Sequence, residues 1–181
     1  MQWLSLFAVL LLLTVHNTNA QSPISPLKIA ADQQGQFVQE KHLTVLSQPF
    51  VTKGYYHYQQ DKGLVWHTQQ PIESEIKITT QGVSERQPSG DFKILTTDSQ
   101  FSEVLLALFS GEQQVLQQQF TLEQQENSLT LMPKAEKISR VIWKITLLLG
   151  ENGIQQIVLY EPEGNYTNIF LSETISSVNQ D

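Results

Sequence analysis

Residues 51–68 read VTKGYYHYQQDKGLVWHT and carry the clearest structural signal in the chain. Two runs rich in Tyr, Val and Trp flank the turn residues Asp61-Lys62-Gly63. Aromatic and β-branched residues favour strands, and a short Gly-containing turn between two such runs is typical of a β-hairpin. Leu64 and Trp66 are two residues apart, so they share one face of the second strand. We therefore predict a hairpin with one apolar face.

The same two-residue period recurs on both sides of this hairpin. Pairs of apolar residues that share a strand face occur at Ile76 and Ile78, at Leu129 and Leu131, and at Trp143, Ile145 and Leu147. Several short strands at regular spacing predict a large antiparallel sheet that curls on itself. The expected strands are residues 35–46, 51–60, 64–68, 73–80, 92–95, 115–122, 128–132, 140–149, 154–160 and 166–171.

One segment, residues 102–110 (SEVLLALFS), breaks the strand pattern. Val104, Leu105, Leu108 and Phe109 recur at helical spacing, a Ser begins the segment and a Gly follows it. These features predict a short amphipathic helix. Residues 24–34 are a second candidate helix, starting after Pro26.

The composition excludes several classes of function. The chain has 181 residues, 40% of them hydrophobic, and a net charge of −7. This length predicts one domain with a sizeable core. Binding of nucleic acid needs clustered Lys and Arg, so the acidic balance argues against a nucleic-acid partner. The sequence contains no Cys, which excludes disulfides, thiolate catalysis and Cys-bound zinc or iron–sulfur centres.

The first twenty residues have the pattern of a secretory signal peptide. Residues 4–15 are almost entirely apolar, and a polar stretch separates them from the small residue Ala20. This run is shorter than the roughly 20 residues that a membrane helix needs. We therefore expect cleavage after Ala20 and export of a single domain, 21–181, with an uncleaved membrane anchor as the alternative. An exported protein without Cys suits a bacterial periplasm.

The sequence offers few groups for catalysis or metal binding. It lacks the G-x-S-x-G, H-E-x-x-H, P-loop and dinucleotide-binding motifs. His57 and His67 lie on opposite strands of the expected hairpin and could face each other, but two imidazoles make a weak metal site. We expect no enzymatic activity, no metal and no other cofactor. A curled sheet must still fill its inner face, either with its own side chains or with an apolar ligand, and the pattern leaves both open.

Several of these segments resemble, in the same order, the LolA family of periplasmic lipoprotein carriers. Phe37-Val38-Gln39 is similar to the family's F-x-Q strand, and Leu64-Val65-Trp66 with Pro71 is similar to its aromatic-Trp-x-x-x-Pro signature. Residues 120–134 (FTLEQQENSLTLMPK) resemble a strand pair that ends in L-x-P-K. Residues 157–171 (IVLYEPEGNYTNIFL) resemble the closing hairpin. The likeness extends over nearly all of the chain after residue 20.

The resemblance implies an incomplete, strongly curved antiparallel β-barrel with short helices over its open mouth, helix 102–110 being part of this lid. An apolar cavity would hold the acyl chains of lipoproteins or related lipids. A monomeric carrier would take them through the periplasm from an inner-membrane donor complex to an outer-membrane acceptor. The side chains expected to line the cavity or the lid are Phe37, Leu43, Leu64, Trp66, Ile76, Ile78, Leu105, Phe109, Leu129, Leu131, Trp143 and Ile145.

The chain departs from the family pattern at one position. Typical members have an Arg in an Arg-Pro-x-x-aromatic-x-Trp context, which helps to hold the lid closed and to release cargo. Counting back from Trp66, that position is Gln60, and Asp61-Lys62-Gly63 replaces the Arg-Pro region. An ammonium such as that of Lys62 lacks the planar fork of Arg. The sequence therefore leaves two identities for the cargo, a lipoprotein or a glycolipid or other lipid-biosynthesis intermediate. A protein-interaction domain with a filled core is the alternative of a different class.

Overall fold

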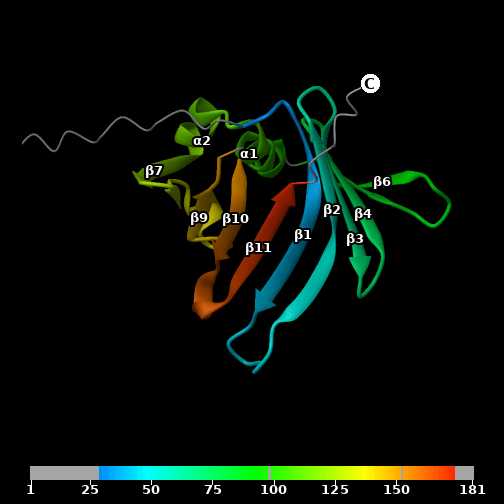
Figure 1. Cartoon of the computed structure of the whole chain (residues 1–181), viewed down its shortest axis with the longest axis horizontal. Coiled ribbons are helices and arrows are strands. Elements are labelled where there is room, and N and C mark those ends of the chain that lie inside the picture. Colours follow the sequence, from blue (N-terminus) through cyan, green and yellow to red (C-terminus); the bar gives the residue numbers. More distant parts are fainter. Residues whose placement is uncertain (1–28, 98, 152, 174–181) are drawn as a thin grey trace, which may run out of the picture.

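The computed structural model describes residues 29–97, 99–151 and 153–173 of the chain. The expected signal peptide (residues 1–20) lies outside these residues, and so does the first part of the candidate helix 24–34. The described residues form eleven strands, three short α-helices and one 3₁₀ turn (Figure 1).

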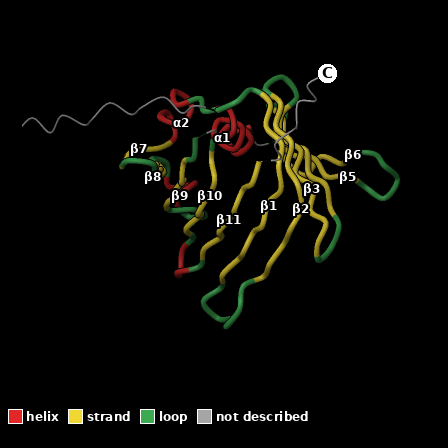
Figure 2. The backbone as a smooth tube through the Cα atoms, viewed as in Figure 1, coloured by secondary structure: helices red, strands yellow, loops and turns green. Residues whose placement is uncertain are grey.

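All of these strands belong to one antiparallel sheet, in the order β6-β5-β4-β3-β2-β1-β11-β10-β9-β8-β7. The pairing of β1 with β11 joins the two halves of the chain, and β6 and β7 are the free edges. The sheet curves without closing, as the smooth backbone trace in Figure 2 shows. This is the incomplete, curved antiparallel barrel that the sequence predicts. The strands are β1 (Asp32–His42), β2 (Phe50–Gln59), β3 (Gly63–Gln70), β4 (Ser74–Thr79), β5 (Gly82–Arg86), β6 (Phe92–Thr96), β7 (Phe120–Gln125), β8 (Ser128–Pro133), β9 (Lys144–Leu149), β10 (Ile154–Tyr160) and β11 (Tyr166–Glu173).

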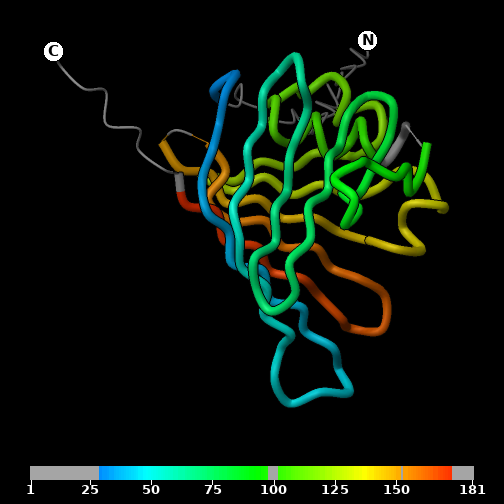
Figure 3. Tube along the Cα trace, turned by 90° about the vertical axis from the view of Figure 1, so that its right-hand side faces the viewer, coloured from blue at the N-terminus to red at the C-terminus, as the bar shows by residue number. Residues whose placement is uncertain are grey.

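Two helices connect the free edges of the sheet. α1 (Ser99–Ser110) follows edge strand β6, and α2 (Gln113–Gln119) leads into edge strand β7. α1 packs on β4 and β5, and α2 packs on β7, so the helices bridge the open side at one end of the sheet (Figures 1 and 2). The β1–β2 loop extends from the opposite end (Figure 3). The remaining helical turns are α3 (Glu136–Ser139) and a 3₁₀ turn at Pro162–Gly164.

None of the helices in the described ranges is long and apolar enough to cross a membrane.

Side chains from alternate strand positions meet on the inner face of the sheet and form one apolar core with α1. Leu64 lies directly opposite Ile78, and Leu129 lies opposite Leu147. α1 contributes Phe109, which is 3% exposed. Complete burial of one such side chain stabilises a fold by roughly 1.5–3 kcal/mol. The inner face is therefore filled by side chains from the sheet and from α1 together.

Two glycines allow neighbouring strands to approach closely, Gly54 between β2 and β3 and Gly35 between β1 and β11. A Cβ atom at Gly54 would lie 1.9 Å from the carbonyl oxygen of His67, and one at Gly35 would lie 2.0 Å from that of Ser172. Any larger residue would force these backbones apart. The space above Gly54 is occupied by the ring of Phe37, whose Cε1 lies 2.9 Å from the position of the absent Cβ. Glycine at these positions permits both the tight sheet and its aromatic filling.

The expected strand 115–122 is wrong in its first half. Gln113–Gln119 form helix α2, and the strand begins only at Phe120. Gln is a good helix former, and Leu116 is the residue that α2 buries, at 0% exposure. A segment with so few apolar residues is compatible with both the helical and the strand period, so tertiary packing decides its conformation.

Three further boundaries differ from the expectation. The candidate helix 24–34 is wrong at its end, because Gln33 and Gln34 lie in β1 and pair with β2. The expected strand 140–149 begins at Lys144, since the turn of α3 precedes it. β5 was not expected; it pairs with β4 across a two-residue turn.

We predict that Gly54→Ala destabilises the fold by about 3 kcal/mol, because the new methyl group would overlap the backbone of β3. Gly90→Ala is the matched control. Unlike Gly54, Gly90 has no neighbour within 4 Å of its absent Cβ, but its φ is +91°, so this change costs about 1 kcal/mol of backbone strain. Urea unfolding measures both differences. Equal destabilisation by the two changes would contradict the close approach at Gly54.

Candidate functional site

The structure gathers most of the sequence-predicted site residues into one place, the space between the inner face of the sheet and α1. Seven lie in the buried core and three are half-buried against it. The buried ones are Phe37, Leu64, Ile78, Phe109, Leu129, Leu131 and Ile145, and the half-buried ones are Trp66, Ile76 and Leu105.

Leu43 and Trp143 do not join this group. Leu43 follows the last residue of β1 and is half-buried. Trp143 precedes β9 in an irregular segment, is 47% exposed, and packs its ring near Tyr160. The expectation that Trp143 shares a face with Ile145 fails because the strand alternation begins only at Lys144.

An aromatic cluster joins α1 to the hairpin of β2 and β3. Phe37 stacks on Trp66, with ring centroids 3.9 Å apart. Phe109 of α1 lies 5.7 Å from the ring of Tyr56 and 6.0 Å from that of Tyr58. Aromatic pairs at such distances add to the burial of apolar area. Phe109 therefore joins the buried Val104, Ala107 and Leu108 in holding α1 on the sheet.

Tyr56 and Tyr58 are absent from the predicted site, although the sequence contains a signal for them. In the hairpin, Tyr56 pairs with Trp66 and Tyr58 pairs with Leu64. This register follows from the position of the turn at Asp61-Lys62-Gly63. Aligning the two arms across the turn would have placed both tyrosines on the inner face.

Gln33 is a further site residue that sequence reasoning missed. Its side chain lies on β1 and is buried, at 8% exposure. The Nε2 atom donates to the carbonyl oxygen of Phe109 at 2.7 Å and to that of Ala30 at 2.8 Å. The last carbonyl groups of a helix have no partner within the helix. Gln33 thus supplies a hydrogen bond to the C-terminal turn of α1, in the interior of the protein.

A second polar contact reaches the same turn of α1. Burial raises the pKa of the Tyr58 hydroxyl, and a hydrogen bond with the Ser110 side chain partly opposes this shift. Tyr58 is 3% exposed, so its hydroxyl needs such a partner. The two contacts fasten one end of the helix to β1 and β2.

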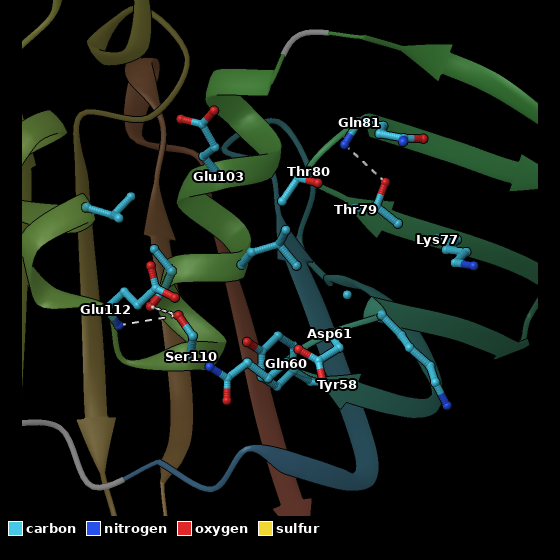
Figure 4. Close-up of a pocket in the computed structure, with 15 residues that line it drawn as sticks. Tyr58, Gln60, Asp61, Lys77, Thr79, Thr80, Gln81, Glu103, Ser110 and Glu112 are labelled. Atoms are coloured by element: carbon cyan, nitrogen blue, oxygen red, sulfur yellow. Dashed lines mark hydrogen bonds between the residues drawn. The ribbon is translucent and has the colours of Figure 1, made fainter.

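A groove of about 480 Å³ runs alongside α1 (Figure 4). We call it the α1 groove. One wall is formed by α1 and the start of α2, and the other consists of the β2–β3 turn and the end of the β4–β5 hairpin. Gln60, which stands at the position of the family's Arg, is on the second wall. The lining residues are Tyr58, Gln60, Asp61, Lys62, Gly63, Lys77, Thr79, Thr80, Gln81, Glu103, Leu106, Ala107, Ser110, Glu112 and Val115.

The two hairpin histidines do not face each other. His67 lies opposite Tyr55 and stacks on its ring, with centroids 4.5 Å apart, whereas His57 contacts Asp32. His67 Nδ1 also lies 3.1 Å from a carboxylate oxygen of Glu75. In the part of the chain that the structure describes, no group of three or more His, Asp or Glu side chains could hold a metal ion.

Glu75 is the centre of a small polar network on the outer face. Its carboxylate accepts a hydrogen bond from Arg86 Nε at 3.0 Å and contacts His67. Burial acts to raise the pKa of Glu75, but the contacts with His67 and Arg86 outweigh it and lower the pKa below its usual range. The network ties β3, β4 and β5 together.

The comparisons with known proteins agree with this architecture. The family model described as "Outer membrane lipoprotein carrier protein LolA" matches residues 30–180. The chain belongs to the LolA family. The match covers every strand and helix described above. A search of curated proteins gave no match.

Solved structures similar to this LolA-family chain are distant. A LolA superfamily protein from Nitrosomonas europaea has 8% identity and a TM-score of 0.47, over 81% of this chain and 86% of that one. A DUF1329 family protein from Desulfovibrio piger has 12% identity and a TM-score of 0.38, over 79% of this chain and 84% of that one. Such low values add nothing to the assignment, which rests on the family model.

We predict that Glu75→Gln destabilises the protein by about 1 kcal/mol at pH 7. The change removes the negative charge from the contacts of residue 75 with Arg86 and His67. A lowered folded pKa means that the carboxylate stabilises the fold above its unfolded pKa. That contribution is lost as the pH falls through the folded pKa, so the two proteins should become equally stable below it. Urea unfolding across this pH range provides the measurement.

The exposed Glu123 on β7 is the control for this change, and Glu123→Gln should alter stability by less than about 0.5 kcal/mol. A destabilisation by Glu75→Gln that does not depend on pH would contradict the role of the charge.

Proposed function

We propose that this protein is a periplasmic carrier that binds the acyl chains of lipoproteins beneath α1 and transports them from the inner to the outer membrane. One observation carries the proposal. The apolar inner face of the open sheet is covered by a short helix pair and not by a second sheet. Membership of a family described as lipoprotein carriers supports the same function.

Transport of a lipid through water places two opposing physical requirements on the carrier. Removing one CH₂ group from water is worth about 0.8 kcal/mol, so exposing a 16-carbon chain costs roughly 12 kcal/mol. A carrier must offer comparable apolar surface and still release its cargo. Because side chains of α1 fill part of the inner face, a bound chain has to replace apolar contacts that the helix makes there, such as those of Val104. The exchange makes net binding weaker than the buried area alone would give, which favours release.

The chemistry required is binding and not bond cleavage. Transport needs an apolar interior, a cover that can move, and partners that load and unload it. Mobile covers are drawn from the less stable parts of a fold, and we propose that the short helix α1 is such a part. A donor complex in the inner membrane would supply the energy for loading, and an acceptor at the outer membrane would bind the cargo more tightly.

Lipid analysis of the purified protein tests the proposal directly. The full chain is produced with its leader in a Gram-negative host, isolated from the periplasm without detergent, and examined by native mass spectrometry. We expect a lipidated protein or a diacyl lipid bound to the chain. A glycolipid in its place would keep the carrier role and correct the cargo. Protein that is free of lipid and that also fails to bind a dipalmitoylated lipopeptide would overturn the proposal.

We predict that Trp66→Glu weakens binding of a dipalmitoylated lipopeptide at least tenfold, because it places a carboxylate on the inner face beside Phe37. Val65→Glu is the matched control, since Val65 is next in the same strand and lies on the opposite face beside Lys77. This variant should bind as the unchanged protein does. Circular dichroism establishes that both variants fold, and Trp66→Ala replaces Trp66→Glu if the latter does not. Equal binding by the two variants would contradict the role of the inner face.

A further inference from the structure

We propose that the α1 groove is the entry site for an acyl chain, and that α1 opens it by pivoting about its last turn, which Gln33 holds on the sheet. The inference rests on the proposed function, because it specifies where the cargo passes between solvent and the inner face.

The last turn of α1 is the fastened end. Gln33 donates to the Phe109 carbonyl oxygen from a buried position, and Tyr58 shares a hydrogen bond with Ser110. The Phe109 ring lies between Tyr56 and Tyr58. Moving this end away from the sheet would break polar contacts and expose an aromatic side chain at once. It is therefore the costly end to displace.

The first half of α1 contains a destabilising feature. Ser102 is 0% exposed, and its hydroxyl oxygen makes no hydrogen bond to the described residues. A buried polar group without a partner costs free energy, because water is lost and nothing replaces it. Tilting this half of the helix outward returns the hydroxyl to water. The same hydroxyl could donate to the carbonyl oxygen of an ester-linked acyl group.

The walls of the α1 groove are not tied to each other at the open end. The helix wall carries Glu103 and Glu112, and the sheet wall carries Lys62 and Lys77 together with Asp61. No salt bridge between the described residues crosses the groove, although carboxylates lie on the helix wall and ammonium groups on the sheet wall. In Figure 4, Glu103 lies across the groove from Gln81, on the side away from Ser110. The helix can thus separate from the sheet here without breaking an ion pair.

The lining of the groove suits a molecule with a polar head and an apolar tail. The rim consists of charged, hydroxyl and amide side chains, which can stay in contact with water and with a polar head. The lining also includes the apolar side chains of Leu106 and Ala107 of α1, and Ala107 belongs to the buried core. An acyl chain that enters beside Ala107 therefore meets the inner face directly when the helix tilts. The volume of about 480 Å³ is within the range of small-molecule sites.

Pairs of spin labels can test the direction of the pivot. The chain contains no Cys, so two introduced cysteines are labelled without background. Glu103→Cys with Gln81→Cys spans the proposed open end, and Glu112→Cys with Gln60→Cys spans the fastened end; all four side chains are exposed. Distances are measured with and without a dipalmitoylated lipopeptide. We expect the 103–81 distance to lengthen on binding and the 112–60 distance to stay constant.

Replacement of Gln33 tests the fastening itself. Gln33→Leu keeps the side-chain volume and removes the donor. The amides in the last turn of α1 should then exchange with solvent about tenfold faster in the ligand-free protein, since one net hydrogen bond changes an opening equilibrium by roughly this factor. Gln36→Leu is the matched control, because Gln36 is exposed on the same strand and its exchange pattern should match that of the unchanged protein.

The outcomes separate this inference from the proposed function. Native mass spectrometry of the labelled samples reports whether the lipopeptide is bound. Bound lipopeptide with a constant 103–81 distance, or with a lengthened 112–60 distance, overturns the pivot and leaves the carrier role intact. Unchanged exchange in Gln33→Leu overturns the role of Gln33. Absence of bound lipopeptide in every sample overturns the proposed function, and the entry site with it.

Discussion

The close approach of the backbones at Gly35 and Gly54 is the constraint on which the remaining structure depends. It allows β1 to approach β11 closely at Gly35 and β2 to approach β3 closely at Gly54, and it leaves room on the inner face for the ring of Phe37. Trp66 stacks on that ring, and the tyrosines of β2 continue the aromatic surface toward α1. A larger residue at either glycine would push the strands apart and remove the surface on which the helix rests.

The helix pair solves the problem of an apolar face that a single sheet cannot cover by itself. In a closed barrel or a sandwich, other strands would bury this face through many permanent contacts. Here a twelve-residue helix does so, with few polar contacts to the sheet. The cover therefore lacks the strand-to-strand hydrogen bonds that join the rest of the sheet. A cover of this kind suits the reversible loading that we propose.

The sequence predicts the strands and turns of the fold better than the contacts between distant side chains. The prediction of a hairpin at residues 51–68 is confirmed. Two aromatic runs predict the strands, and Gly63, which has a positive φ, predicts the turn between them. The sequence does not predict α2, because a Gln-rich segment with one buried Leu fits neither the helical nor the strand period decisively. Trp143 was misplaced because a strand pattern was extended through a turn.

Gln33 could not be recognised from the sequence for a different reason. Its partner Phe109 is 76 residues further along the chain, and nothing in either segment marks the pair. Local patterns predict which residues face inward, because burial of apolar side chains imposes a period. They do not predict which buried amide meets which carbonyl group, because that depends on how distant elements dock. The resemblance to a family supplied the expectation of a lid, but not the means by which this chain holds it.

The way the helices are connected sets a limit on their motion. α1 begins three residues after the end of one edge strand, and α2 continues without a break into the other. A residue spans at most about 3.6 Å of extended chain, so the cover is on a short tether at both ends. It cannot leave the sheet without drawing an edge strand along with it. Loading of the interior would thus be transmitted mechanically to β6 and β7, the two margins where another protein could sense it by pairing a strand.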